Sequence, residues 1–339
     1  MQTISTMNDI SDYTEAHKIL WSVQIELLSL CNFSCKHCYI PNRTSKGIPL
    51  KKIKELAESF FEMGVFDVTL TGGEIFLRDD ILEIVEAFRS RGLRVQLFSN
   101  GSLLNREVCE KLKSLGIYQF STTIFSLDAE INDYITCHRN SLATILSNIS
   151  LLQEYEIPIE IKMPIMKSNY SSYAGLKKYC HDNNFGFFPS ACISPKTDGD
   201  PAPLQFELED SDFGKISREI RSAPSNSSSS APVPFDRDET ICHSLFNSVF
   251  IDSAGNVFPC ISWQIKIGNI YEKSIEDIWA NSEMLHYLRT LKKSDMKFCG
   301  KCEYSSSCTI CPGDSMADGD MLGCSSLEKK LAKSILGLI

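Results

Sequence analysis

Six short strand-like runs alternate with amphipathic segments between residues 23 and 192, and this alternation constrains the fold more than any other feature of the chain. The runs expected to be strands are Val23–Leu28, Asp67–Thr71, Arg94–Phe98, Gln119–Ser126, Ile159–Met163 and Gly186–Cys192. Three intervening segments have apolar residues at helical spacing and end at Gly64, Gly92 or Gly116, as helices commonly do. Strands that alternate with helices form a parallel sheet with helical crossovers. Since a closed barrel has eight such units, six predict an α/β fold, either an open sheet or a partial (β/α)6 TIM-like barrel, with function at the carboxyl ends of the strands.

The charge and hydropathy of the chain exclude some classes of partner. A formal net charge of −9 argues against nucleic acid. No run reaches the roughly 18 apolar residues that a membrane span needs. The first 20 residues show no basic region followed by an apolar stretch, so we expect no signal peptide and a cytoplasmic location.

Fourteen cysteines are then the unusual feature of the composition. In a reducing compartment, grouped cysteines more often bind metal or take part in chemistry than form disulfides. One group is Cys31, Cys35 and Cys38, and the other is Cys242, Cys260, Cys299, Cys302, Cys308, Cys311 and Cys324. The remaining four, Cys109, Cys137, Cys180 and Cys192, are scattered. The two groups therefore predict two metal-binding regions.

The first group follows the first predicted strand with the spacing Cys31-x3-Cys35-x2-Cys38. Three thiols at this spacing are suited to three irons of a [4Fe–4S] cluster. A zinc site with a fourth ligand such as His37 is an alternative, and a disulfide is another. The spacing alone leaves these readings open.

A Gly72-Gly73-Glu74 turn ends the second predicted strand, and with the cysteines it makes the chain resemble the radical S-adenosylmethionine (SAM) superfamily. The segments Ser99-Asn100-Gly101 and Phe125–Ala129, after the third and fourth strands, also match. The resemblance covers about residues 20–195. It implies that Cys31, Cys35 and Cys38 bind a [4Fe–4S] cluster whose fourth iron is left for SAM.

The resemblance also implies roles for other residues near SAM. It places Thr71, Gly72, Gly73 and Glu74 at the methionine end, Ser99 and Asn100 near the ribose, and Ser126 and Asp128 on the fourth-strand side of the same pocket. His37 is expected on the adenine side, as a shape-giving residue more than a metal ligand. Lys162, from the fifth strand, is a candidate for the SAM carboxylate.

The second cysteine group resembles the SPASM domain, an auxiliary iron–sulfur module, although zinc sites would be expected for this segment in isolation. By this resemblance Cys242, Cys260 and Cys311 hold the nearer auxiliary [4Fe–4S] cluster, and Cys299, Cys302, Cys308 and Cys324 hold the outer one. The nearer set has three cysteines, so its fourth iron is predicted to be open to substrate. Three [4Fe–4S] clusters and SAM are the expected cofactors.

Four regions are predicted from the composition along the chain. They are an N-terminal extension (1–20), the partial barrel (21–195), a bridging region with a flexible Ser/Pro-rich segment (196–236) and the small cysteine-rich iron–sulfur domain (237–339). Only about 20 residues precede the first strand, too few for a winged leader-binding module. A separate recognition protein, or leader binding by the barrel itself, is therefore implied.

The resemblance favours a peptide-modifying enzyme. SAM cleavage would give a 5′-deoxyadenosyl radical that abstracts hydrogen from a ribosomal precursor peptide, leading to a thioether or C–C crosslink, with flavodoxin or ferredoxin as the reductant. The alternatives are a peptide epimerase with Cys192 or Cys137 as hydrogen donor, a formylglycine-generating sulfatase maturase, a small-molecule dehydrogenase or tetrapyrrole enzyme, and a zinc-binding interaction protein.

Overall fold

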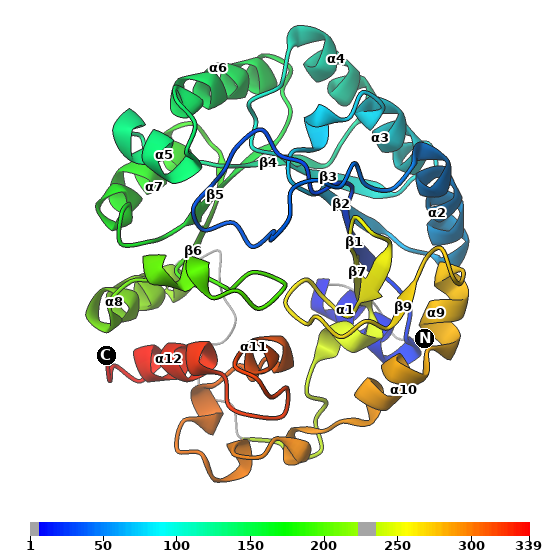
Figure 1. Cartoon of the computed structure of the whole chain (residues 1–339), viewed down its shortest axis with the longest axis vertical. Coiled ribbons are helices and arrows are strands. Elements are labelled where there is room, and N and C mark those ends of the chain that lie inside the picture. Colours follow the sequence, from blue (N-terminus) through cyan, green and yellow to red (C-terminus); the bar gives the residue numbers. More distant parts are fainter. Residues whose placement is uncertain (1–6, 223–234) are drawn as a thin grey trace.

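The computed structural model, which describes residues 7–222 and 235–339, contains a nine-stranded sheet (Figure 1). The strands follow the order β6-β5-β4-β3-β2-β1-β7-β8-β9. The first six are β1 (Ser22–Glu26), β2 (Asp67–Thr71), β3 (Arg94–Phe98), β4 (Gln119–Thr123), β5 (Ile159–Pro164) and β6 (Gly186–Ser190), and all of them pair in parallel. The prediction of six parallel strands in a partial barrel is confirmed.

The outer face of this sheet is covered by helices (Figure 1). They are α2 (Leu50–Met63), α3 (Ile81–Arg89), α4 (Arg106–Leu115), α5 (Ala129–Thr136), α6 (Ser141–Glu154) and α7 (Tyr173–Asp182). In α2 the inward-facing Ile53, Leu56 and Phe60 are buried, and the helix ends because Gly64 takes a left-handed conformation with φ 77°. The glycines predicted to end helices thus fix where the chain turns back into the sheet.

The cysteine-rich region continues the same sheet beyond β1. Strand β7 (Ser248–Ile251) pairs in parallel with β1, and β8 (Asn256–Phe258) and β9 (Gly268–Asn269) follow as antiparallel neighbours. The side chains of Val249, Ile251 and Val257 are buried in the same core as the strands of the barrel. The second cysteine group is therefore attached rigidly to the edge of the barrel.

The C-terminal residues pack at the β6 edge of the sheet, the edge opposite β9. Helix α12 (Ser326–Ile335) packs on α8 (Asp210–Arg221), which lies beside β6 (Figure 1). Arg218 ties the two helices together by donating to the carbonyls of Ser334 at 2.9 Å and Ile339 at 2.7 Å. Helix α8 falls within the predicted bridging region, while the Ser/Pro-rich part of that region lies mostly outside the described residues.

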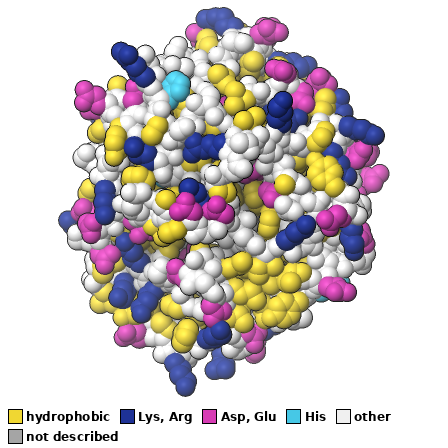
Figure 2. Space-filling model, viewed as in Figure 1, with side chains coloured by type: hydrophobic (Ala, Val, Ile, Leu, Met, Phe, Trp, Pro, Cys, Tyr) yellow, Lys and Arg dark blue, Asp and Glu magenta, His cyan; other side chains and the backbone are white. Residues whose placement is uncertain are grey.

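The remaining helices are short. Helix α1 (Met7–His17) precedes β1, and α9 (Ile275–Asn281), α10 (Glu283–Thr290) and α11 (Pro312–Ala317) lie in the cysteine-rich region. None of the described helices is long and apolar enough to cross a membrane. On the face shown in Figure 2, acidic and basic side chains are interspersed, which is unlike the broad basic surface of a nucleic-acid-binding protein.

Candidate active site

The loop that carries Cys31, Cys35 and Cys38 leaves β1 and crosses the carboxyl ends of the strands (Figure 1). Arg43 holds this loop in shape, because its guanidinium donates to the carbonyls of Phe33 at 2.9 Å and Cys35 at 3.3 Å. Burial, and then the neighbouring thiols of Cys38 and Cys31, raise the pKa of Cys35 to about 12. The three half-buried cysteines are therefore close together.

The donor set of this loop fits an iron–sulfur cluster better than a single ion. Around one zinc ion, four ligands at about 2.3 Å converge tightly, whereas the thiols of a cubane bind separate irons and lie further apart. Among the described residues, no group of three or more His, Cys, Asp or Glu side chains is arranged to hold a single ion. Three thiolates in a sheltered loop are the donors that a [4Fe–4S] cluster requires.

The Gly72-Gly73 turn packs directly on the backbone of the cysteine loop. A Cβ at Gly73 would lie 2.1 Å from the carbonyl oxygen of Leu30, and one at Gly72 would lie 2.4 Å from that of Leu28. The amide of Gly73 donates to the Leu28 carbonyl at 3.0 Å. The glycines are thus required first for the close approach of two backbone segments, which positions the turn next to the cysteines.

Glu74 lies behind this turn with no exposed surface. Its carboxylate accepts hydrogen bonds from the Ser99 hydroxyl at 2.8 Å, the Asn100 amide at 2.7 Å and the Phe76 amide at 2.9 Å. Burial raises its pKa, and these three donors lower it. In this structure Glu74 fastens the end of β2 to the end of β3, and its predicted contact with the SAM amino group stays a prediction.

A cavity of about 210 Å³ lies among these segments, and we call it the strand-end cavity. Its walls include the predicted residues Cys31, Cys35, Cys38, His37, Thr71, Gly72, Gly73, Ser99, Asn100 and Lys162. Asn100 is oriented by Asn32, whose side-chain oxygen accepts a hydrogen bond from its amide at 2.8 Å. Residues predicted from four different strand ends therefore converge on one cavity.

Ser126 and Asp128 follow β4 and are not among the residues that line the strand-end cavity, and their predicted place in the SAM pocket stays a prediction. The Ser126 hydroxyl is hydrogen-bonded to that of Ser172 at 2.8 Å. The carboxylate of Asp128 caps α5 by accepting from the amides of Glu130 and Ile131. Both side chains are used to start the helix that follows β4.

Lys162 projects from β5 into the strand-end cavity without an ion-pair partner among the described residues. Its ammonium lies 2.9 Å from the ring centroid of Phe98. Burial lowers its pKa to about 8, and the negative charge of Glu160 opposes this shift. A desolvated cation facing a cavity is suited to an anionic group of a ligand.

Replacing Lys162 with methionine should weaken SAM binding by about 10- to 100-fold, the usual worth of a hydrogen bond to a charged group. The wild-type pKa of about 8 adds a pH signature. As the pH rises through 8, Lys162 loses its proton and SAM affinity should fall, whereas Lys162→Met should lack this fall. Equilibrium dialysis with labelled SAM between pH 6.5 and 9.5 measures both, and parallel pH profiles for the two proteins would contradict the assignment.

His37 separates the strand-end cavity from a larger one. Its ring lies edge-on to Phe125, with 5.0 Å between the centroids, and its Nδ1 is buried without a hydrogen-bond partner. Burial lowers the pKa of His37 to about 4, so the ring is neutral. His37 thus lines both spaces, and its place on the adenine side of SAM stays a prediction.

The larger space, which we call the bridging cavity, has a volume of about 590 Å³. Its lining includes His37 and Tyr39, which flank Cys38, and also Ile261, next to Cys260, and Asp314, near Cys311. A substrate in the bridging cavity would therefore lie between the first cysteine group and the nearer auxiliary set.

The cysteines of the nearer auxiliary set, Cys242, Cys260 and Cys311, are half-buried. Burial raises the pKa of Cys260 to about 11, and Cys242 and Asp314 contribute. The segment after Cys311 packs on the segment after Cys260, because a Cβ at Gly313 would lie 2.9 Å from the backbone of Ser262. The donors present fit the three-cysteine set predicted for an iron–sulfur cluster.

The predicted outer set is also close together. Burial raises the pKa of Cys299, with smaller contributions from Cys324 and Cys302. Burial likewise raises that of Cys308 to about 11, with Cys299 and Cys302 among its neighbours. Cys324 is exposed and the other three are half-buried. Four thiols at this surface fit a second auxiliary cluster.

The two candidate hydrogen donors lie in different environments. Cys192 lines the bridging cavity, and burial raises the pKa of its thiol to about 11, so it carries its hydrogen at neutral pH. Cys137 is exposed in a left-handed turn after α5, with its thiol 3.7 Å from the Tyr134 carbonyl, and it lines neither cavity. Cys137 is nevertheless among the neighbours that raise the pKa of Cys35, and both donor assignments stay predictions.

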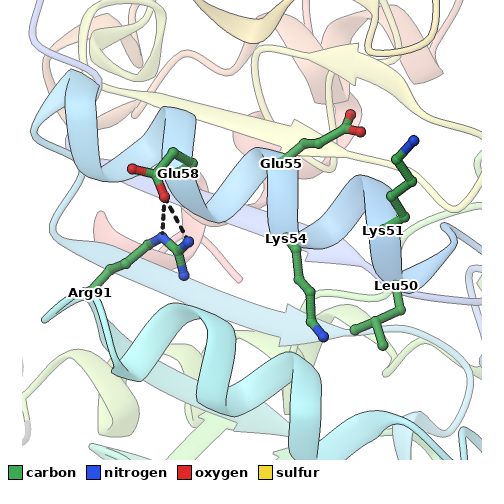
Figure 3. A pocket seen from close by; sticks show the side chains of 6 residues that line it. All are labelled: Leu50, Lys51, Lys54, Glu55, Glu58 and Arg91. Carbon is green, nitrogen blue, oxygen red and sulfur yellow. Dashed lines mark hydrogen bonds and ion pairs between the residues drawn. The ribbon is translucent and has the colours of Figure 1, made fainter.

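A third hollow lies on the outer surface between α2 and α3 (Figure 3). It is lined by side chains that pair with one another or with neighbours: Arg91 with Glu58, and Lys54 with Glu83. No cysteine and no strand end reaches it. It is a solvated surface of two helices and not a second site.

Comparisons with known proteins agree with the geometry. The family model for the radical SAM superfamily matches residues 25–176, and the SPASM model, an iron–sulfur cluster-binding domain, matches residues 242–303. An AdoMet-dependent heme synthase of Methanosarcina barkeri is 26% identical over 88% of this chain and 93% of its own length. The antilisterial bacteriocin subtilosin biosynthesis protein AlbA of Bacillus subtilis is 24% identical over 84% of this chain and 66% of its own length.

Solved structures show the same fold. The crystal structure of Streptococcus suis SuiB bound to S-adenosylmethionine has a TM-score of 0.74 at 18% identity, covering 97% of this chain and 84% of SuiB. SuiB bound to the precursor peptide SuiA gives a TM-score of 0.73 at 16% identity, covering 97% and 82% of the two chains. With its cysteine loop, its strand-end cavity and both family matches, the chain belongs to the radical SAM superfamily and is a radical SAM enzyme with a C-terminal SPASM domain.

Proposed function

We propose that this enzyme modifies a peptide substrate in the bridging cavity, forming a thioether or carbon–carbon crosslink in a ribosomal precursor peptide. When bound, SAM and its cluster supply a radical that removes a hydrogen atom from the substrate. The protein residues orient SAM in the strand-end cavity, exclude water and present the substrate residue across the wall formed by His37.

The observation that carries this proposal is the position of the bridging cavity. Its lining combines residues beside Cys38 with residues beside Cys260 and near Cys311. A crosslink requires that the substrate lose a hydrogen atom to the radical and then one electron and one proton, which together account for the loss of two hydrogens. The open position predicted for the nearer cluster would face the substrate in this arrangement.

The charges of the bridging cavity favour a peptide over a tetrapyrrole. Lys196 is its only cationic lining residue among the described part of the chain, and Asp200 neutralises it at 2.6 Å. Asp198 and Asp314 add negative charge. A porphyrin that carries several carboxylates would be repelled from these walls, whereas a neutral or basic peptide segment would not be.

Tetrapyrrole chemistry is the second candidate, and the similarity to heme synthase favours it. The test is co-expression of this protein with small open reading frames encoded beside it, followed by mass spectrometry of each peptide. A peptide lighter by two hydrogens supports crosslink formation. Unchanged peptides, together with conversion of an iron porphyrin by the purified enzyme, would replace this proposal with the second candidate.

The protonated thiol of Cys192 permits one further distinction between crosslinking and epimerisation. If the enzyme crosslinks, Cys192→Ala should leave the dehydrogenated product and alter its yield by no more than about threefold, because the residue is then packing. If it epimerises, the variant should fail to return hydrogen to the substrate. Deuterium incorporated from solvent into the product of the wild-type enzyme, and its loss in the variant, would identify the epimerase.

A further inference from the structure

The sulfur atom of Cys31 lies next to two N–H groups. The backbone amide of Phe33 lies 3.4 Å from it, and the side-chain amide nitrogen of Asn100 lies 3.9 Å from it. Phe33 is held in place by Arg43, which donates to its carbonyl at 2.9 Å. Phe33 belongs to the cysteine loop itself, whereas Asn100 follows β3. The sulfur predicted to bind one iron of the first cluster is therefore approached by donors from two separate segments.

A ring of hydrogen bonds, which we call the asparagine ring, directs the side chain of Asn100. Asn100 donates to the side-chain oxygen of Asn32 at 2.8 Å, and the side-chain nitrogen of Asn32 donates to the Ser102 hydroxyl at 2.9 Å. The backbone amide of Ser102 closes the ring by donating to the side-chain oxygen of Asn100 at 2.9 Å. Since a backbone N–H can only donate, this last bond fixes which end of the Asn100 amide is oxygen. The other end, with its two N–H groups, then faces Asn32 and Cys31.

The backbone after β3 is held independently of Asn32. The amide of Asn100 donates to the buried carboxylate of Glu74 at 2.7 Å, and Asn148 of α6 donates to the carbonyl of Gly101 at 2.8 Å. Asn32 is not among the residues that line the strand-end cavity. Loss of the Asn32 side chain would therefore release the side chain of Asn100 while the backbone of this segment stays in place.

An N–H group directed at a cluster ligand affects how easily the cluster accepts an electron. Reduction adds one negative charge, and part of this charge is carried by the sulfur atoms. An N–H dipole beside a sulfur stabilises the reduced state more than the oxidised state, and hydrogen bonds to the sulfurs are among the features that set the reduction potential of an iron–sulfur cluster. The donors at Cys31 should therefore raise the potential of the first cluster.

We propose that Asn32 is a positioning residue for electron transfer at the first cysteine group. It holds the Asn100 amide against the sulfur of Cys31 and thereby raises the reduction potential of the cluster bound there. This role does not depend on the substrate, because both candidate functions need the same cluster to be reduced before SAM is cleaved.

Asn32→Ala should lower the reduction potential of the first cluster. With the asparagine ring broken, the Cys31 sulfur loses the directed donor from Asn100, and the equilibrium constant for one-electron reduction should fall about tenfold, the scale of one hydrogen bond to a charged group. This corresponds to a shift of about 59 mV to lower potential. The measurement is a redox titration of the cluster-containing enzyme with dithionite, followed by electron paramagnetic resonance. The signal of the first cluster is identified by its change when SAM is added.

Ser102→Ala breaks the same ring from outside the cysteine loop and should give a smaller shift in the same direction, so it tests the proposal even if Asn32→Ala fails to assemble the cluster. The matched control is Asn42→Ala, the same chemical change in the same loop at an exposed residue whose side chain contacts Thr44. It should keep the wild-type potential. Iron content, measured first, shows which variants contain the cluster. An unchanged potential in either ring variant that contains the cluster, or an equal fall in Asn42→Ala, would overturn the proposal.

Discussion

Cys35→Ala should reduce SAM cleavage by at least about 10³-fold, because removing one member of a cooperating catalytic group usually removes the whole function. Burial raises the pKa of Cys35 to about 12, so a bound metal would have to displace the proton of its thiol at neutral pH. Without this ligand the first cluster should not assemble, while the auxiliary sites lie elsewhere and should still bind iron.

The measurement for Cys35→Ala is iron content together with 5′-deoxyadenosine formation after chemical reduction. If each of the three sites holds four irons, the content should fall from about twelve to about eight per chain. Cys180→Ala is the matched control, since Cys180 is a fully buried packing residue of α7. It should keep its iron and its activity. Undiminished SAM cleavage in Cys35→Ala would remove the first cysteine group from the mechanism.

The six parallel strands could be predicted because short β-prone runs such as Asp67–Thr71 and Arg94–Phe98 alternate with helical stripes, and glycines such as Gly64 and Gly116 mark the ends of the helices between them. Strands β7 to β9 could not be predicted in the same way. They are two to four residues long, and β7 is stabilised by pairing with β1, which lies far away in the sequence. Such short strands depend on tertiary contacts and leave little periodicity to detect.

The cysteine positions of the site could be predicted from their spacing and from the family resemblance, whereas its supporting contacts could not. Arg43 was missed because a lone arginine in a loop gives no sign that it will donate to the carbonyls of Phe33 and Cys35. The capping role of Asp128 could have been predicted, because an aspartate directly before the helix that begins at Ala129 is a typical N-cap. For both residues the contacts depend on the direction in which the side chain points, and the residue type alone does not determine that direction.

Gly73→Ala should destabilise the protein by about 3 kcal/mol or more and abolish SAM binding, because the new methyl group has no space and overpacking of this kind forces the backbone to move. The Cβ would lie 2.1 Å from the Leu30 oxygen and 2.5 Å from the Ser29 oxygen, and these backbone atoms are held by the loop that carries the cysteines. The hydrogen bond from the Glu74 amide to the Leu30 carbonyl, now 2.8 Å, would break as the two segments separate.

Gly175→Ala is the control for this prediction, because it makes the same chemical change where nothing lies within 4 Å of the new Cβ. Gly175 is inside helix α7, so alanine should stabilise the protein by up to about 1 kcal/mol. Thermal unfolding and SAM titration of both variants separate the two effects. If Gly73→Ala unfolded and bound SAM like Gly175→Ala, the contact between the glycine turn and the cysteine loop would not be what holds the strand-end cavity in shape.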